Sequence, residues 1–211
     1  INLSDPANAS VLNAVPTTDS AVGVALSSDG TTTTAYVADS AGGLQIIDVS
    51  NPATASVTGS VSTSGTAVDV ALSSDGTTAY VADSLSGLQI IDLVTETVTN
   101  TVATSGIAVS VTLSDDGLTA YVADSVGGLE IIDLVTETVT NTVTTSGTAE
   151  SVALSDDGLT AYVADGVAGL QIIDLATATI TGTVATAGAA VSVTLDGSTA
   201  YVVDGTYGLQ I

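Results

Sequence analysis

The chain contains no lysine, arginine, histidine, cysteine, methionine, tryptophan or phenylalanine. Without basic side chains it lacks the electrostatic contacts that hold phosphate groups, so we expect neither nucleic-acid binding nor attraction to anionic membranes. A Ser-His-Asp triad, a thiol nucleophile and a Schiff-base amine are excluded. Zinc, copper and haem lack their usual nitrogen and sulfur ligands. What remains is the oxygen chemistry of carboxylates, hydroxyls and amides, which suits Ca²⁺ or sugars.

The missing basic residues leave a formal net charge of −23 on 211 residues. We therefore expect the protein to repel itself at low ionic strength and to be stabilised by screening salt or bound cations. No apolar run approaches the roughly 20 residues that span a bilayer, so we expect no direct membrane insertion. Residue 1 is Ile rather than Met. We expect the chain to be a processed or excised piece of a larger exported protein.

A repeat of about 42 residues runs through the chain, which is the signature of an array of similar structural units. Each copy contains the element Y-V-A-D or Y-V-V-D and then G-L-[QE]-I. The tyrosines of these elements are Tyr36, Tyr80, Tyr121, Tyr162 and Tyr201.

Each repeat predicts four short strands. In the second copy they are residues 67–72, 78–83, 88–92 and 97–102, with Asp75-Gly76 as a hairpin turn between the first two. The first three strands are apolar on both faces and the fourth is polar, the pattern of a propeller blade with a solvated outer edge. The sequence therefore predicts an all-β fold: a single five-bladed β-propeller domain over residues 1–211, with four antiparallel strands per blade.

The two ends of the chain are in phase with the repeat. Residues 1–15 align without gaps on residues 47–61, and the last residue, Ile211, corresponds to Ile46. We predict that residues 1–15 supply the outer strand of the fifth blade and close the ring by pairing with the C-terminal blade. The alternative is a fragment cut from a longer array.

The motif Y-V-A-D-x-x-x-G-L-Q-I-I-D-V-S-N-P, complete from Tyr36 to Pro52, resembles the LVIVD-repeat proteins of bacterial and archaeal cell surfaces. The later I-D-L-x-T-x-T-[VI]-T-x-T-V stretches are similar to YVTN-type surface-layer propellers. The resemblance covers essentially the whole chain. It implies a propeller with an extracellular or cell-surface location, and it implies no reaction.

One set of candidate ligand-binding residues is the aspartate that ends each Y-V-[AV]-D element. Five such carboxylates would form a ring on the face that carries the turns between second and third strands. The alternative is that each aspartate accepts backbone N–H groups in its own turn, and identity in all five copies favours this. The residues are Asp39, Asp83, Asp124, Asp165 and Asp204.

Departures from the repeat give the other candidates. Asp69 and Glu150 are unique acids near the start of an innermost strand, where their counterparts are Gly, Ser or Val. Each is either solvated at the channel mouth or binds a cation, and Ca²⁺ is the metal that we would expect. Tyr207 is the only aromatic residue at its turn position, where it could stack on a sugar or pack on its neighbours.

These features favour a non-enzymatic extracellular or cell-surface module that binds ligands or acts as a scaffold within a larger exported protein. Its expected partners are other surface proteins, carbohydrate or copies of itself. It requires no cofactor other than a possible Ca²⁺. An alternative is a self-assembling subunit of a surface layer or filament. A carboxylate-based glycosidase is a third hypothesis, weakened because nearly all acids occupy repeated turn positions.

Overall fold

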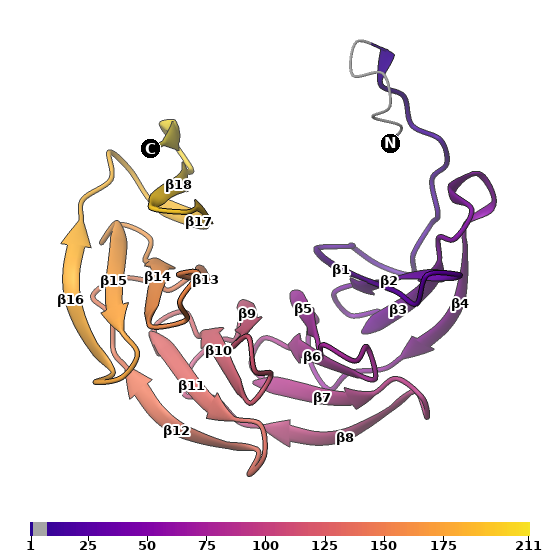
Figure 1. Ribbon diagram of the computed structural model, residues 1–211, viewed down its shortest axis with the longest axis horizontal. Coiled ribbons are helices and arrows are strands. Elements are labelled where there is room, and N and C mark those ends of the chain that lie inside the picture. Colours follow the sequence, from indigo (N-terminus) through magenta and orange to yellow (C-terminus); the bar gives the residue numbers. More distant parts are fainter. Residues whose placement is uncertain (2–7) are drawn as a thin grey trace.

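The chain folds into five antiparallel sheets that stand side by side in an open arc, as the computed structural model shows (Figure 1). The structure describes residue 1 and residues 8–211. The first strand of each sheet faces the centre of the arc and the last lies at its periphery. The predicted all-β propeller of five blades is confirmed.

Strand order within each blade follows the sequence from inside to outside, so short hairpins join all neighbours. Blade 1 comprises β1 (Gly23–Ser28), β2 (Thr33–Ala38), β3 (Leu44–Asp48) and β4 (Ser56–Val61). Blade 2 comprises β5 (Asp69–Leu72), β6 (Thr78–Ala82), β7 (Leu88–Asp92) and β8 (Thr97–Val102). Blade 3 comprises β9 (Ser110–Leu113), β10 (Thr119–Ala123), β11 (Leu129–Asp133) and β12 (Thr138–Val143). Blade 4 comprises β13 (Ser151–Leu154), β14 (Thr160–Ala164), β15 (Leu170–Asp174) and β16 (Thr179–Val184).

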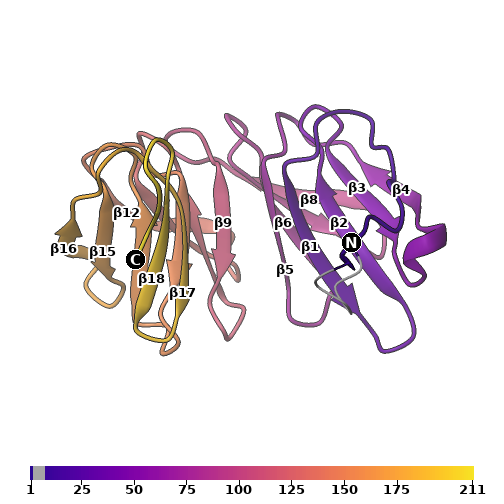
Figure 2. The same cartoon turned by 90° about the horizontal axis from the view of Figure 1, so that it is seen from above.

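Blade 5 contains only three strands among the described residues: β17 (Ala190–Asp196), β18 (Thr199–Asp204) and β19 (Gly208–Gln210). The fourth strand was predicted from residues 1–15. Of these, residues 2–7 lie outside the described part, and residues 8–15 form no strand with β19. Figures 1 and 2 show blade 1 and blade 5 on opposite sides of a gap. Closure of the ring by this pairing is therefore not confirmed.

The hydrophobic core lies between successive blades. Tyr36, Leu44 and Val61 of blade 1 pack against Val70 and Ile91 of blade 2, and the same arrangement recurs at the next two interfaces. Middle strands are buried on both faces because each is covered by a blade on either side. Burial of one such side chain contributes about 1.5–3 kcal/mol, so the inter-blade contacts hold the arc together.

Glycine in the G-L-[QE]-I element is required by a close approach of two chain segments. Gly87 has a φ of 76°, and a Cβ at this position would lie 2.3 Å from the carbonyl oxygen of Val102. Both the left-handed backbone and the contact exclude other residues. In the first four blades this glycine therefore fixes how the third strand meets the end of the fourth.

Aspartates form the turns between the first and second strands of the blades and the turns between the third and fourth strands, as predicted. Asp75 accepts hydrogen bonds from the Ser73 hydroxyl and from the N–H and hydroxyl of Thr77, and these bonds lower the pKa of its carboxyl. Asp92 accepts N–H groups from Val94 and Thr95 at the next turn, which also lowers its pKa. The counterparts with the same type of contact are Asp29, Asp116, Asp157, Asp48, Asp133 and Asp174.

Candidate functional site

Each blade buries one carboxylate immediately after its second strand. In the first four blades this aspartate follows β2, β6, β10 and β14, and in the fifth it is the last residue of β18. All five are almost completely inaccessible to solvent: Asp39, Asp83, Asp124, Asp165 and Asp204. Burial of a charged group is costly unless hydrogen bonds replace water, so the partners of these carboxylates decide their role.

The partners lie in the loop that enters the same blade. Asp83 Oδ2 accepts the N–H of Gly65 at 2.7 Å, and Asp39 Oδ2 accepts the N–H groups of Thr18 and Asp19, both at 2.9 Å. The interpretation that each aspartate caps its own turn is therefore wrong for these blades, because the donors come from a segment about 20 residues earlier. Only Asp204 also accepts N–H groups from its own turn.

Burial and hydrogen bonding act on these carboxyls in opposite directions. Burial raises the pKa of Asp83 above its ordinary value, although the bond from the N–H of Gly65 opposes the shift. At Asp39 burial also opposes ionisation, but the bonds from residues 17–19 outweigh it, so the pKa lies below the ordinary value. The carboxylates therefore differ between blades in how readily they ionise, although they share a position in the repeat.

Three of the buried carboxylates have an oxygen without a hydrogen-bond partner in the structure: Asp39 Oδ1, Asp83 Oδ1 and Asp124 Oδ1. In blades 2 and 3 a threonine hydroxyl of the entering loop, Thr63 or Thr104, is buried and unpaired as well. At the same position of blade 4, Thr145 donates its hydroxyl to an aspartate Oδ1 at 2.6 Å. In blades 2 and 3 a rotation of this hydroxyl would pair it with the free aspartate oxygen.

A buried glutamate breaks the repeat next to one of these aspartates. Glu130 occupies the column that elsewhere holds glutamine, and it is fully buried in β11. Its Oε1 accepts the N–H and the hydroxyl of Ser105, whose hydroxyl also lies 3.3 Å from Asp124 Oδ2. Two acidic side chains thus share one serine in a buried site. Burial raises the pKa of Asp124, and the nearby negative charge of Glu130 adds to the shift.

Sequence reasoning missed Glu130 as a candidate, although the signal was present in the G-L-[QE]-I pattern. In blades 1, 2 and 4 the glutamine Nε2 donates to a backbone carbonyl, as Gln45 does to Gly42 at 2.9 Å, and in blade 5 Gln210 Nε2 donates to Asp204 Oδ2. An ionised carboxylate has no proton to donate. Glu130 therefore replaces a donor by an acceptor in a buried position that is built for a donor.

The first acid near the channel, Asp69, links two blades. Its Oδ2 accepts the N–H of Val111 in β9 at 3.0 Å, and its Oδ1 accepts the N–H of Val70. Gly23, its counterpart in blade 1, packs so closely on blade 2 that a Cβ would lie 2.8 Å from the carbonyl oxygen of Val68. Close packing between blades 1 and 2 thus explains the glycine at this position of blade 1, apart from any role of Asp69 in binding.

The other two departures from the repeat lie elsewhere along the arc. Glu150 is half-buried and directly precedes β13 in blade 4, so β9 of blade 3 lies between it and Asp69. Tyr207 is exposed on blade 5, where its ring lies over the backbone of Gly188. The structure therefore spreads the three residues over blades 2, 4 and 5.

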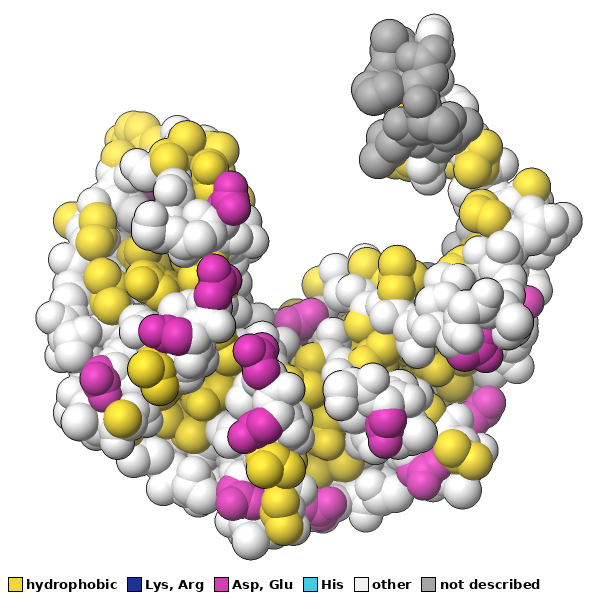
Figure 3. Space-filling view, viewed as in Figure 1, with side chains coloured by type: hydrophobic (Ala, Val, Ile, Leu, Met, Phe, Trp, Pro, Cys, Tyr) yellow, Lys and Arg dark blue, Asp and Glu magenta, His cyan; other side chains and the backbone are white. Residues whose placement is uncertain are grey.

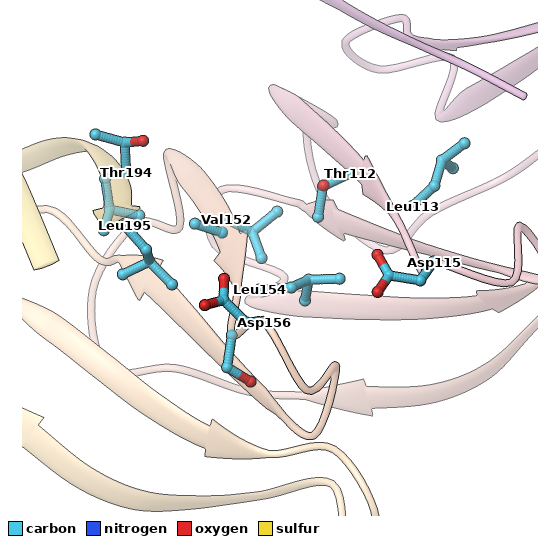
Figure 4. A pocket seen from close by; sticks show the side chains of 11 residues that line it. Thr112, Leu113, Asp115, Val152, Leu154, Asp156, Thr194 and Leu195 are labelled. Carbon is cyan, nitrogen blue, oxygen red and sulfur yellow. The ribbon is translucent and has the colours of Figure 1, made fainter. Parts of the chain in front are cut away.

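A hollow of about 460 Å³ lies between the innermost strands of blades 3, 4 and 5 (Figure 4). Its walls include Val152, Leu154 and Leu195, and the carboxylates of Asp115 and Asp156 lie at the turns that border it. These turns are at the opposite end of the strands from the buried aspartates. None of the predicted site residues lines this hollow.

The acidic side chains are dispersed over the blades on the face that Figure 3 shows, and hydrophobic side chains gather at the free end of blade 5. Within the described residues, no group of three acidic side chains is placed as ligands of one metal ion. In the same part of the chain, no helix is long and apolar enough to cross a membrane.

Because no cation in the sequence offsets 23 carboxylates, we expect the melting temperature to rise by several degrees between about 0.01 M and 1 M NaCl. Over that range the Debye length falls from ~30 Å to ~3 Å, which screens repulsion between blades. Calorimetric melting curves measure the effect, and KCl should act like NaCl if screening is the cause. A melting temperature independent of both salts contradicts the prediction.

Family models describe this repeat. The LVIVD repeat model matches residues 34–63, 64–94, 105–135 and 146–178, which together make up more than half of the chain. The chain belongs to the LVIVD repeat family. The first LVIVD match begins in β2 and ends just after β4, whereas the other three begin in the loop before the first strand of a blade and end in the turn after its third strand. These three begin 41 residues apart, so the family repeat and the structural blade have the same period.

Solved structures share the fold of this LVIVD-repeat chain. A chain of the hydrazine synthase of Kuenenia stuttgartiensis is 21% identical with a TM-score of 0.78, over 89% of this chain and 56% of that chain. This chain thus spans about half the length of that relative, and at this identity the likeness shows the fold alone. A comparison with curated proteins finds no match. Neither result assigns an activity.

Proposed function

We propose that this LVIVD-repeat propeller is a non-enzymatic scaffold or ligand-binding module that works outside the cell as part of a larger exported protein. The observation that carries the proposal is the use of the buried aspartates. The carboxylates of Asp39, Asp83, Asp124, Asp165 and Asp204 accept hydrogen bonds from the chain's own loops. One oxygen of each carboxylate thus holds the entering loop against its blade, which supports a structural role over acid–base catalysis.

The face of the arc with the buried aspartates is the one that we propose for ligands. Asp69, Glu150 and Tyr207 interrupt the repeat on this side. On the other side, the turns between the first and second strands are nearly uniform. A repeat supplies a uniform framework, and a specific ligand needs positions that differ between blades. Carbohydrate or another surface protein fits the hydroxyls, amides and acids available there.

Calcium is the ligand to test first. Calorimetric titration should show saturable binding at roughly 10⁻⁴–10⁻³ M, which is typical of extracellular modules. We expect the heat to disappear in the double variant Asp69→Asn, Glu150→Gln and to persist in the control Asp115→Asn, Asp156→Asn. The control removes the same charge from the opposite face. Equal binding by both variants would contradict the proposal that Asp69 and Glu150 bind Ca²⁺.

A second candidate function is a subunit of a self-assembling surface layer or filament. The observation that favours it is the exposure of large apolar side chains at both ends of the arc, with Val24 and Leu26 at one end and Leu209 and Ile211 at the other. Exposed apolar faces of this kind mark association surfaces in soluble proteins.

A further inference from the structure

The hollow of about 460 Å³ between the innermost strands of blades 3, 4 and 5 combines aliphatic walls with two acids at its border. Val152, Leu154 and Leu195 form the walls, and Asp115 and Asp156 belong to the turns that border it (Figure 4). In Figure 4 the side chain of Leu154 is seen between the two carboxylates. Blades 3, 4 and 5 follow one another in the chain, so the hollow is internal to the arc.

Both of these acids break the repeat. The residue before the turn aspartate is Ser28 in blade 1 and Ser74 in blade 2, whereas blades 3 and 4 have a second aspartate there, Asp115 and Asp156. The turn does not need this second acid, because the turn of blade 2 forms with serine at the same position. The added acids are found in the two neighbouring blades whose turns border the hollow.

The added carboxylates are free, whereas the turn aspartates beside them are bonded. Asp116 accepts the hydroxyl of Ser114 at 2.6 Å and the N–H of Leu118 at 3.0 Å. Within the part of the chain that the structure describes, the side chains of Asp115 and Asp156 accept no hydrogen bond, and both residues are exposed. The sequence has no lysine, arginine or histidine to pair with them. A cationic partner therefore comes from outside these blades.

The walls of the hollow select the class of cation. Ca²⁺ takes six to eight oxygen ligands, whereas these walls are largely aliphatic, and the described residues place no three acidic side chains around one metal ion. None of the residues that line the hollow is aromatic, so it offers no stacking surface for a sugar. An aliphatic stem with a charged head fits both features, as when lysine packs its methylene groups on an apolar surface and keeps its ammonium in water.

We propose that this hollow binds a primary ammonium group on an aliphatic stem, as found in a lysine side chain or a small alkylamine. The ammonium pairs with Asp115 and Asp156, and the stem contacts Val152, Leu154 and Leu195. The site lies at the opposite end of the strands from the face proposed for Ca²⁺, so either proposal can fail without the other.

A second hollow in the same chain is an internal comparison. It measures about 370 Å³ and lies between the first strands of blades 1 and 2, where Ser28 and Ser74 replace the added acids. Its acids, Asp29 and Asp75, already accept hydrogen bonds within their own turns. We therefore expect this hollow to bind an alkylammonium ion much more weakly.

An NMR titration with butylammonium chloride at constant ionic strength tests the proposal. We expect saturable shifts of the backbone N–H signals of residues 112–115 and 152–156, and none at Ser28 or Ser74. From ethylammonium to butylammonium, binding should tighten about fourfold for each added methylene, because each one is buried against the wall. Butanol has the stem without the charge and should not bind.

A double variant, Asp115→Asn with Asp156→Asn, should weaken butylammonium binding by about tenfold. The matched control is Glu96→Gln with Glu137→Gln, which removes the same charge from turns at the same end of blades 2 and 3. It should bind like the unaltered chain. Equal weakening by the two double variants, equal shifts at the two hollows, or an affinity independent of stem length would each overturn the proposal, because the amine would then only gather around an acidic protein.

A peptide distinguishes the two sources of the ammonium group. The probe is a glycine pentapeptide with one central lysine and blocked ends, and the same peptide with an acetylated lysine is its control. If the lysine peptide binds as tightly as butylammonium, the hollow accepts a lysine of a partner protein. If butylammonium alone binds, the hollow is a site for free amines. Binding of neither probe overturns the proposal.

Discussion

Replacing Asp83 with alanine is expected to lower the stability of the propeller by about 3 kcal/mol or more. The carboxylate is inaccessible to solvent and accepts the N–H of Gly65 at 2.7 Å. Alanine would leave this buried N–H without an acceptor and would open a space between the entering loop and blade 2. For a chain of this size, the loss corresponds to a fall in melting temperature of about 10 °C.

The matched control is Asp75→Ala in the exposed turn of the same blade. It removes the same negative charge, so any gain from reduced repulsion is common to both variants. Because Asp75 bonds its own turn in contact with water, its loss should shift the melting curve much less. Equal shifts for the two variants would show that the buried aspartate is no more than a turn former, as the sequence alone suggested.

The propeller could be predicted from the sequence because the evidence for it is local and repeated. Alternating apolar strands, Asp-Gly turns and a polar fourth strand recur at a constant spacing, and each copy carries the same folding information. Gly87 illustrates this: its place in the repeat indicates a position without room for a side chain, and the structure shows that a Cβ there would lie 2.3 Å from the carbonyl oxygen of Val102. The five blades and their inner-to-outer strand order follow from such signals.

The partners of the buried aspartates could not be predicted in the same way. The donors to Asp39 are Thr18 and Asp19, which are about 20 residues earlier and belong to a loop with no distinctive pattern. A hydrogen bond between segments that far apart depends on how two hairpins pack together, which no motif encodes. The turn interpretation was the local alternative, and it holds only at Asp204, whose carboxylate accepts N–H groups from its own turn as well as from the entering loop.

The gap between blade 1 and blade 5 could not be predicted from the sequence either. The curvature of the arc depends on the angle between neighbouring blades, and that angle is set by how side chains such as Tyr36 and Ile91 fill each interface. Small residues in the core do not fix that angle in any pattern that can be read from the chain.

Replacing Glu130 with glutamine is expected to stabilise the propeller by about 1–2 kcal/mol. The substitution restores the glutamine found at this column in the other blades, and in blades 1, 2 and 4 its side-chain amide donates to a backbone carbonyl. It also removes one of two acidic groups that share the hydroxyl of Ser105 in a buried site. Calorimetry should show a melting temperature several degrees higher. Glu96→Gln, at an exposed turn, is the control with the same change of charge.

The gain from Glu130→Gln should depend on pH. Burial, reinforced by the charge of Glu130, raises the pKa of Asp124 in the folded state. Between the unfolded carboxyl pKa of about 3.9 and that raised value, the folded state binds more protons than the unfolded state, so stability falls as pH rises. Glutamine at position 130 removes part of the shift and hence part of that loss. The difference in melting temperature between variant and parent should therefore be largest near neutral pH and shrink toward about pH 4. A constant difference across this range, or a lower melting temperature for the variant at neutral pH, would show that the two acids do not interact.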